Sequence, residues 1–442
     1  MGADSIFALA SAPGRAGIAV VRLSGPGSGG ALAVLAGGRP AARRASLRAI
    51  RDPVSGEALD QGLVFWFPGP ASFTGEDMAE LHLHGGKGVV SAVLAALGRI
   101  PNLRPAEPGE FTRRAFDHGR LDLTEAEGLA DLIDAETEAQ RRQALRQLGG
   151  ELGRLYEGWR ARLLQALARI EAYLDFPDEG LPAGLAAEVT GQAQAVEGEI
   201  QAHLNDARRG ERLRDGLRIA ILGPANAGKS SLLNMLTRRE AAIVSNLAGT
   251  TRDVIEVALD LGGYPVVVAD TAGLRTVTNE VEAEGVRRAR SQAEAADIKI
   301  ILVDGAAWPA TDPGVLELIG ADSLVVVNKC DLEAVPKAPL VAGRAALAVS
   351  VRDGTGIDEF LSRLQGMVVE RLAGNAPAPT RERHRRALED CVGALGRHRL
   401  ATLPELGAED LRLAVRALGR ITGAVDVEDI LDAIFREFCI GK

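Results

Sequence analysis

The sequence predicts a multidomain protein of mixed α/β and all-α class. We expect an N-terminal α/β domain over residues 1–118, a helical domain made of residues 119–214 and 373–442, and a second α/β domain inserted over residues 215–372. The length of 442 residues leaves room for about three domains. Apolar positions at helical spacing occur on both sides of a segment in which strand-like and helix-like runs alternate. A Pro-rich linker at residues 374–380 ends that segment.

Composition bounds the class of protein. A hydrophobic fraction of 46% is sufficient for several cores, and the net charge of −9 excludes a protein that is basic all over, although a local basic patch stays possible. Three cysteines, Cys330, Cys391 and Cys439, argue against a disulfide framework and for a reducing compartment. We find no signal peptide, and no apolar run reaches the roughly 18 residues that span a bilayer. The expected location is the cytoplasm, without membrane attachment.

The N-terminal region shows both strand and helix patterns. Glu80 to His84 alternates as a strand does, and Val89 to Leu97 has helical spacing. His82 and His84 share one strand face. No Cys or third His accompanies them, so two histidines on a half-exposed strand are favoured over a metal site.

The helical segments have identifiable starts and stops. Thr124 to Ala126 predicts a helix start, with Glu127 completing a capping box, and Gly149–Gly150 predicts a break. The helix that follows is expected to end at residues 176–182, and another runs to about Arg214. Three later helices are predicted at Arg383–Arg397, Glu409–Leu418 and Val427–Phe438.

The inserted segment alternates strands and helices, which indicates a parallel sheet with crossover helices. Several of its strands are continuous apolar runs, as buried parallel strands are. The predicted strands are Leu217–Leu222, Val254–Leu259, Val266–Ala269, Ile298–Val303, Leu324–Val327 and Ala346–Val349.

A phosphate-binding loop is predicted at residues 223–230. The stretch Gly-Pro-Ala-Asn-Ala-Gly-Lys-Ser fits the pattern G-x-x-x-x-G-K-[ST], and the required strand and helix flank it. Gly223 and Gly228 allow backbone N–H groups to surround a phosphate chain, and the N-terminus of the following helix adds positive electrostatic potential there. Lys229 is expected to reach the β- and γ-phosphates and Ser230 to ligate Mg²⁺.

Four further motifs follow at strand ends, in the order found in Ras-like GTP-binding domains. They are Gly249–Asp253 with Thr251, Asp270–Gly273, Asn328–Asp331 and Ser350–Val351. Thr251 can complete the Mg²⁺ shell, and Asp270 can hold a Mg²⁺-bound water. Guanine offers N1–H and N2–H donors to the Asp331 carboxylate, whereas adenine has an acceptor at N1. The sequence therefore predicts a GTP-binding domain.

The residue that orients the attacking water is not obvious. Ras-type domains place Gln directly after the Asp-Thr-Ala-Gly motif, but Leu274 stands here. Glu282 and Glu284 are candidates, although the sequence alone favours solvated helix charges. Asn226 and main-chain carbonyls within 245–250 could hold a monovalent cation that supplies positive charge.

Over its full length the sequence resembles the MnmE (TrmE) family of tRNA-modification GTPases. The terminal Cys439-Ile-Gly-Lys442 is the most specific motif, and its Gly and Lys do not fit a prenylation box. The other motifs that carry the resemblance are Ala12–Ile18, Arg22–Gly25, Ser72–Asp77, Glu80-Leu81, His84–Gly86, Pro108–Phe111, Arg120–Leu123 and Ala130–Ala135.

The resemblance implies an activity and its partners. The family hydrolyses GTP and, with the FAD-containing protein MnmG (GidA), adds a carboxymethylaminomethyl-type group at C5 of the wobble uridine (position 34) of certain tRNAs. It implies a homodimer formed through the N-terminal domain, a heterotetramer with the partner, and GTP hydrolysis when two G domains meet across K⁺. The one-carbon unit comes from a tetrahydrofolate derivative, 5-formyl- or 5,10-methylene-tetrahydrofolate.

The resemblance also implies site residues. Mg²⁺ would be held by Ser230 and Thr251, and K⁺ by Asn226, Ser245, Leu247 and Thr250. Glu282 would orient water, and Cys439 would take part in modification in an undefined role. Folate contacts fall on Arg22, Glu80, Arg120 and Lys442, with Arg120 where the family usually has Lys. The implied GTP contacts are Asn226, Ala227, Gly228, Lys229, Ser230, Ser231, Ser245, Asn246, Leu247, Ala248, Gly249, Thr250, Thr251, Asp270, Thr271, Ala272, Gly273, Asn328, Lys329, Asp331, Ser350 and Val351.

Two other classes of function are weighed against this one. A GTPase that acts as a ribosome-assembly or RNA-binding switch would carry a KH-type module or a second phosphate loop, and we find neither. A mechanical GTPase on membranes would be expected to carry a basic amphipathic helix, which is also not found.

Overall fold

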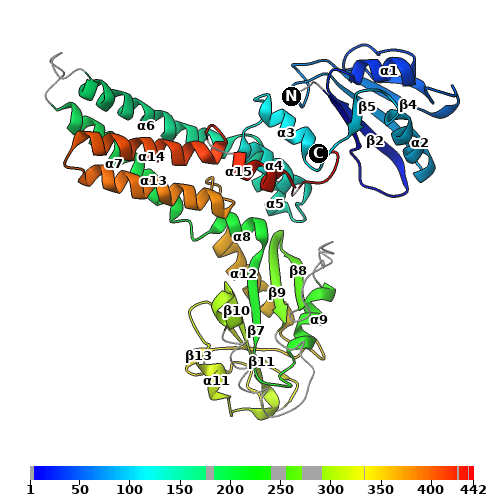
Figure 1. Cartoon of the computed structure of the whole chain (residues 1–442). Coiled ribbons are helices and arrows are strands. Elements are labelled where there is room, and N and C mark those ends of the chain that lie inside the picture. Colours follow the sequence, from blue (N-terminus) through cyan, green and yellow to red (C-terminus); the bar gives the residue numbers. More distant parts are fainter. Residues whose placement is uncertain are drawn as a thin grey trace, which may run out of the picture. The chain divides into compact units, whose positions relative to one another are not determined.

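The computed structural model describes residues 4–175, 184–239, 255–270, 291–332, 334–425, 428–436 and 438–442, and Figure 1 traces the chain. The chain forms two compact units, and their boundary passes within long helices. The predicted domain limits therefore stay a prediction. The first unit comprises Met1–Ala130, Arg146–Gln192 and Arg397–Lys442, and the second comprises Asp131–Leu145 and Ala193–Gly396.

The N-terminal part is a six-stranded sheet in the order β3-β4-β5-β2-β1-β6. Only the β1–β6 pair is parallel; the other neighbours are antiparallel. Its elements are β1 (Ser5–Leu9), β2 (Ala16–Ser24), α1 (Ser28–Ala36), β3 (Ser46–Arg51), β4 (Ala58–Phe67), β5 (Met78–Gly85), α2 (Lys87–Leu97), β6 (Leu103–Pro105) and α3 (Glu110–Asp117).

The two faces of this sheet differ. Val21, Leu81 and Val64 point to one face and pack with α1 and α2 in a buried core. Because side chains alternate along a strand, Arg22 and Glu80 point to the other face. The sequence therefore places a polar pair on the face that these two helices leave uncovered.

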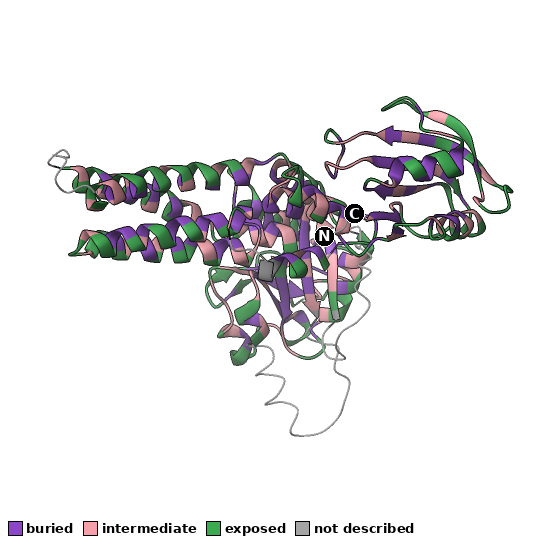
Figure 2. Cartoon of the chain, turned by 45° about the horizontal axis from the view of Figure 1, so that its top comes forward, coloured by how far each residue is buried: buried purple, intermediate pink, exposed green. Residues whose placement is uncertain are grey.

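The helical part consists of amphipathic helices. Along α6, the buried residues recur at three- and four-residue spacing, and α6 packs against α14. Figure 2 shows buried and exposed residues on opposite sides of such helices. The helices are α4 (Leu123–Ile133), α5 (Glu138–Leu148), α6 (Glu151–Asp175), α7 (Leu185–Leu204), α8 (Arg209–Asp215), α13 (Glu382–Leu400), α14 (Pro404–Thr422) and α15 (Glu428–Arg436).

The predicted capping box at Thr124 and Glu127 is wrong by two residues. Glu125 N donates to Asp122 Oδ1 at 2.8 Å, and Asp122 N donates to Glu125 Oε2 at 2.8 Å. This reciprocal pair caps α4 because it satisfies two N–H groups at the helix start. Both Thr124 and Glu127 are buried within the helix instead.

Two helix breaks have local causes. Gly149 and Gly150 separate α5 from α6, as predicted. The helix expected to continue to Arg214 is divided into α7 and α8, because Ala207 and Arg208 have φ values of 52° and 57°. Among the described helices, none is both long and apolar enough to cross a membrane.

The inserted part contains a six-stranded sheet in the order β14-β11-β10-β7-β9-β8. A small two-stranded sheet, β12-β13, accompanies it. The elements are β7 (Leu217–Leu222), α9 (Lys229–Arg239), β8 (Ile255–Leu261), β9 (Tyr264–Asp270), β10 (Ile298–Asp304), η1 (Gly305–Ala307), α11 (Pro313–Leu316), β11 (Ser323–Asn328), β12 (Leu340–Val341), β13 (Arg344–Ala345), β14 (Leu347–Ala348) and α12 (Ile357–Leu372).

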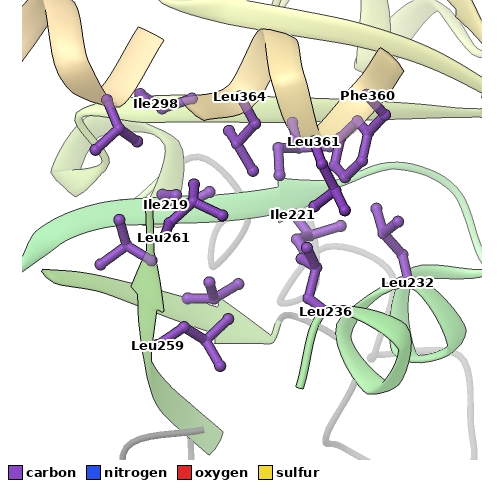
Figure 3. Packing of buried hydrophobic residues seen from close by; sticks show 14 of the residues in the cluster. Ile219, Ile221, Leu232, Leu236, Leu259, Leu261, Ile298, Phe360, Leu361 and Leu364 are labelled. Atoms are coloured by element: carbon purple, nitrogen blue, oxygen red, sulfur yellow. The ribbon is translucent and has the colours of Figure 1, made fainter. Parts of the chain in front are cut away.

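The core of this part is formed by β7 with α9 and α12. Ile219 and Ile221 belong to one buried cluster with Leu232 of α9 and Phe360 of α12; in Figure 3, Ile221 lies toward Leu232 and Phe360, and Ile219 lies nearer Leu261. Each of these side chains is at most 1% exposed. This packing fixes the end of β7, and therefore the phosphate loop that follows it.

One expectation about the sheet is wrong. β8 pairs with β9 in the antiparallel direction, with Leu261 opposite Tyr264. The two strands are joined by Gly262 and Gly263, and a two-residue turn is too short for the crossover that parallel neighbours need. The other neighbours in this sheet are parallel.

Candidate functional site

The loops predicted to bind nucleotide lie at one edge of the inserted sheet. The parallel strands β7, β10, β11 and β14 end at this edge, and Asp304 is in register with Asn328. After β7 the chain builds β8 and β9 on one side and then returns to the other side with β10. A strand order that reverses in this way marks the ligand site of open α/β sheets.

Two glycines allow the phosphate loop to pack closely. Gly223 has φ 156°, and a Cβ there would lie 2.3 Å from Leu302 O. Gly228 has φ 100°, and its Cβ would lie 2.3 Å from Asn328 Nδ2. Only glycine fits both positions. Lys229 Nζ donates to Gly223 O and Pro224 O, each at 2.8 Å, so its ammonium group lies against the loop.

Asn328 joins the phosphate loop to residues 328–331, which we call the base-recognition loop after its predicted role. Its Nδ2 donates to Ala227 O at 2.8 Å, and its Oδ1 accepts from Val351 N at 3.2 Å. The side chain is 4% exposed. A buried amide with both ends paired holds the three segments at fixed separation.

The base-recognition loop carries charged groups with defined neighbours. Lys329 Nζ lies 2.8 Å from Asp304 Oδ2, a partner that the sequence analysis missed although Asp304 ends a buried strand. Asp331 lies 4.0 Å from the exposed Arg352. Burial, with the nearby Asp353 and Asp331 carboxylates, raises the pKa of the Cys330 thiol, so this cysteine stays protonated.

For several residues predicted to contact the nucleotide, the structure gives a position but no ligand contact. Asn226 is exposed and has φ 63°, Ser230 and Ser231 begin α9, and the Asp270 backbone ends β9 opposite Ile221. The following predicted residues lie outside the described ones: Ser245, Asn246, Leu247, Ala248, Gly249, Thr250, Thr251, Thr271, Ala272, Gly273, Leu274, Glu282 and Glu284.

A second polar site lies on the face of the N-terminal sheet that α1 and α2 leave uncovered. Arg22 Nη2 and Glu80 Oε1 are 3.0 Å apart on neighbouring strands, and each side chain is about one-fifth exposed. His82 Nε2 lies 3.2 Å from Glu80 Oε2. The Arg22 guanidinium also lies 5.6 Å and 5.8 Å from the ring centres of Phe73 and Phe111.

The C-terminal residues approach this site. Ile440 pairs with Pro108, and Gly441, with φ 96°, packs so closely that a Cβ would lie 2.3 Å from Leu9 O. Leu9 is next to Ala8, which is opposite Arg22 in the sheet. The structure therefore brings Lys442 toward the strands that carry Arg22 and Glu80.

Two remaining predicted residues lie in the same unit. Arg120 Cγ would lie 3.4 Å from a Cβ at Gly75, in the loop that also carries Phe73. Cys439 is exposed, directly before the Ile440 bridge. Arg120 thus lies near the loop that carries Phe73, but the structure shows no contact between Arg120 and Arg22 or Glu80.

The phosphate loop, the Asn328 bridge and Asp331 define a P-loop domain of the guanine-nucleotide-binding class. Comparison with known families gives the particular family. The MnmE helical domain matches residues 123–439, and the N-terminus of the GTP-binding protein TrmE matches residues 5–120. The chain belongs to the MnmE family of tRNA modification GTPases.

Individual relatives agree with this assignment. A tRNA modification GTPase MnmE of Paramagnetospirillum magneticum is 57% identical over 99% of this chain and 100% of its own length. The zebrafish protein named 5-taurinomethyluridine-[tRNA] synthase subunit GTPB3, mitochondrial, is 49% identical over 100% of this chain and 94% of its own length. Among solved structures, a FeoB G domain from T. maritima is 21% identical over 36% of this chain and 99% of its own, with a TM-score of 0.25, and the assignment does not rest on it.

Proposed function

We propose that this protein hydrolyses GTP as part of a cytoplasmic enzyme that modifies tRNA. In this proposal it acts with the FAD-containing protein MnmG (GidA) in a heterotetramer. Together they add a carboxymethylaminomethyl-type group at C5 of the wobble uridine, position 34. The relatives named above as a tRNA modification GTPase and as a 5-taurinomethyluridine-[tRNA] synthase subunit support a role in uridine modification.

The observation that carries the GTPase proposal is the bond from Asn328 Nδ2 to Ala227 O at 2.8 Å. It links the loop that selects the base to the loop that holds the phosphates. Lys229, at the N-terminus of α9, provides positive charge where phosphate oxygens would lie. Asp331 provides the carboxylate that selects guanine.

Two described residues, Ser230 and Asn226, offer oxygen ligands for cations, and the other proposed ligands lie outside the described residues. The Ser230 hydroxyl at the start of α9 suits Mg²⁺, with Thr251 as a second oxygen ligand. The exposed Asn226 amide suits K⁺, completed by Ser245, Leu247 and Thr250. When bound, these ions stabilise negative charge that develops on the phosphates. Leu274 cannot hydrogen-bond water, and the family resemblance implies that Glu282 orients it instead; both residues lie outside the described ones.

The site at Arg22 and Glu80 suits a flat, polar ring system. A guanidinium group and a carboxylate offer donors and acceptors, and the half-buried ring of Phe73 lies beside them. We propose that a tetrahydrofolate derivative, 5-formyl- or 5,10-methylene-tetrahydrofolate, binds there. Lys442 and Arg120 are further proposed contacts, and the exposed Cys439 would meet the uridine chemistry near this site.

The uncovered sheet face also supports a homodimer formed through the N-terminal domain. Ile18, Leu47 and Leu63 are 63%, 63% and 39% exposed. Leu47 is opposite Leu63, Leu63 is opposite His82, and His82 is opposite Val20, so they form one surface. Exposed apolar side chains grouped on one sheet face are typical of a protein interface, and here His82 lies among them. We expect Leu47→Glu to yield monomers in sedimentation analysis.

Two measurements test the proposed function. GTP hydrolysis is compared in potassium and in sodium, and equal rates contradict the K⁺ site. Calorimetry with 5-formyltetrahydrofolate compares the intact chain, Arg22→Ala and a chain lacking Lys442, with Arg386→Ala as an exposed control. We expect both site changes to weaken binding by about tenfold or more. No binding to the intact chain would favour the RNA-switch alternative.

A further inference from the structure

The first fifty residues carry a charge imbalance that the nucleotide and folate sites do not use. Residues 5–51 contain seven arginines and no aspartate, glutamate or lysine, in a chain whose net charge is −9. Arg22 belongs to the polar site described above. The other six are exposed. The imbalance therefore appears at the protein surface rather than in the core.

Four of these arginines form a group at one edge of the N-terminal sheet. Arg39, Arg43 and Arg44 lie between α1 and β3, and Arg48 lies on β3, the edge strand next to β4. We call these four residues the basic strip. Within the described ranges, none of the four has a carboxylate partner, whereas Arg99 is paired with Asp52.

Aromatic rings of β4 hold two members of the basic strip. The Arg39 guanidinium lies 5.3 Å from the centre of the Trp66 ring, and that of Arg43 lies 5.9 Å from the centre of the Phe67 ring. Arg43 also donates to Ala71 O. These contacts orient the two side chains without neutralising their charge, so N–H groups stay available to an anion.

We propose that the basic strip binds the phosphate backbone of tRNA. Guanidinium groups match phosphate oxygens in two-point hydrogen bonds. The turn closed by Arg44 N and Ala41 O, followed by β3, places the four arginines around one edge of the sheet, where they can contact neighbouring phosphates. This inference rests on the proposed tRNA function and says where on the chain the RNA lies. Arg48 points to the sheet face opposite Leu47, so it lies apart from the proposed dimer surface.

Another explanation for arginines on an edge strand is protection against edge-to-edge aggregation. That explanation covers Arg48, but Arg39, Arg43 and Arg44 precede the strand and two of them lie over rings. An acidic surface of a protein partner is the other anion that could pair with the basic strip. The experiment separates these cases.

The experiment measures tRNA affinity of the full chain by fluorescence anisotropy over a range of KCl concentrations. The test variant is Arg44→Gln with Arg48→Gln. The control is Arg141→Gln with Arg142→Gln, because it removes the same charge from exposed arginines that Glu138 already pairs. We expect the test variant to bind about tenfold more weakly at 0.1 M KCl and its log–log salt slope to fall by about 1.4 to 1.8. The control should change affinity by less than about twofold.

Each result has a distinct meaning. Unchanged tRNA binding by the test variant, or an equal loss in the control, overturns the inference while leaving the tRNA function intact. Normal tRNA binding with lost binding of the FAD partner, or with only increased aggregation, also overturns it. If the unmodified chain does not bind tRNA, the proposed tRNA function fails together with the inference. A thermal unfolding profile equal to that of the unmodified chain shows that the test variant is folded.

Discussion

Replacing Asn328 with alanine tests the central bridge of the nucleotide site. The substitution removes the donor to Ala227 O and the acceptor of Val351 N, which lie at 2.8 Å and 3.2 Å. A buried polar group that loses its partner costs about 1–3 kcal/mol. Because the bridge spans the phosphate and base loops, we expect GDP and GTP binding to weaken by about 2–4 kcal/mol, or at least about thirtyfold.

The assay is stopped-flow binding of a fluorescent guanine nucleotide to the full chain. Cys330→Ala is the matched control, since Cys330 lies in the same motif and its side chain takes no part in the bridge. It should change affinity by less than about threefold. If Asn328→Ala binds within threefold of the unmodified chain, or if the control loses as much, the bridge does not position the two loops.

Three further predictions follow from the second unit. Asp331→Asn should weaken GTP binding about a hundredfold and favour xanthosine triphosphate, whose O2 accepts a hydrogen bond where guanine donates, as a competition assay would show. The Arg385 side chain is 8% exposed, and it pairs with Glu211 at 2.7 Å and Asp206 at 2.9 Å. Arg385→Ala should therefore lower the free energy of unfolding of the unit by about 3–5 kcal/mol in urea. Arg386→Ala, at an exposed position, should lower it by less than about 0.5 kcal/mol. Burial lowers the pKa of His203 to about 4, so the folded unit binds this proton less readily than the unfolded chain does. About 3 kcal/mol of the free energy of unfolding should therefore be lost as the pH falls from about 6.5 to 4. The His203→Gln variant should not show this loss.

The sheet of the inserted part could be predicted because its strands are short apolar runs between turn signals. β7 has the predicted bounds, Leu217–Leu222, at both ends. Strand β8 contains Glu256 and Asp260 among its apolar residues, which is more typical of an antiparallel strand than of a buried parallel one, and this signal was missed. Gly262 and Gly263 were a second signal, since they leave room only for a hairpin turn.

The phosphate loop could also be predicted, because its characteristic residues fall within eight consecutive positions between a strand and a helix. The contacts that complete the site could not. Asn328 meets Ala227 across 101 positions of sequence, and Lys329 meets Asp304 across 25. Such contacts depend on strand order and register, which no local pattern specifies. The capping box of α4 failed for a different reason, since two overlapping patterns fit and the structure uses Asp122.

The nucleotide site and the proposed folate site both depend on a glycine that packs closely against a backbone oxygen. Gly223 packs against Leu302 O and Gly441 packs against Leu9 O, and in each case an added Cβ would lie 2.3 Å from a backbone oxygen. A backbone oxygen cannot swing aside as the end of a side chain can, so the position of Lys229 and that of Lys442 both depend on an adjacent or nearby glycine. The two lysines that we propose to contact ligands are thus placed by glycines that have no proposed ligand contact. It follows that each site can be lost with every charged side chain still present in the sequence.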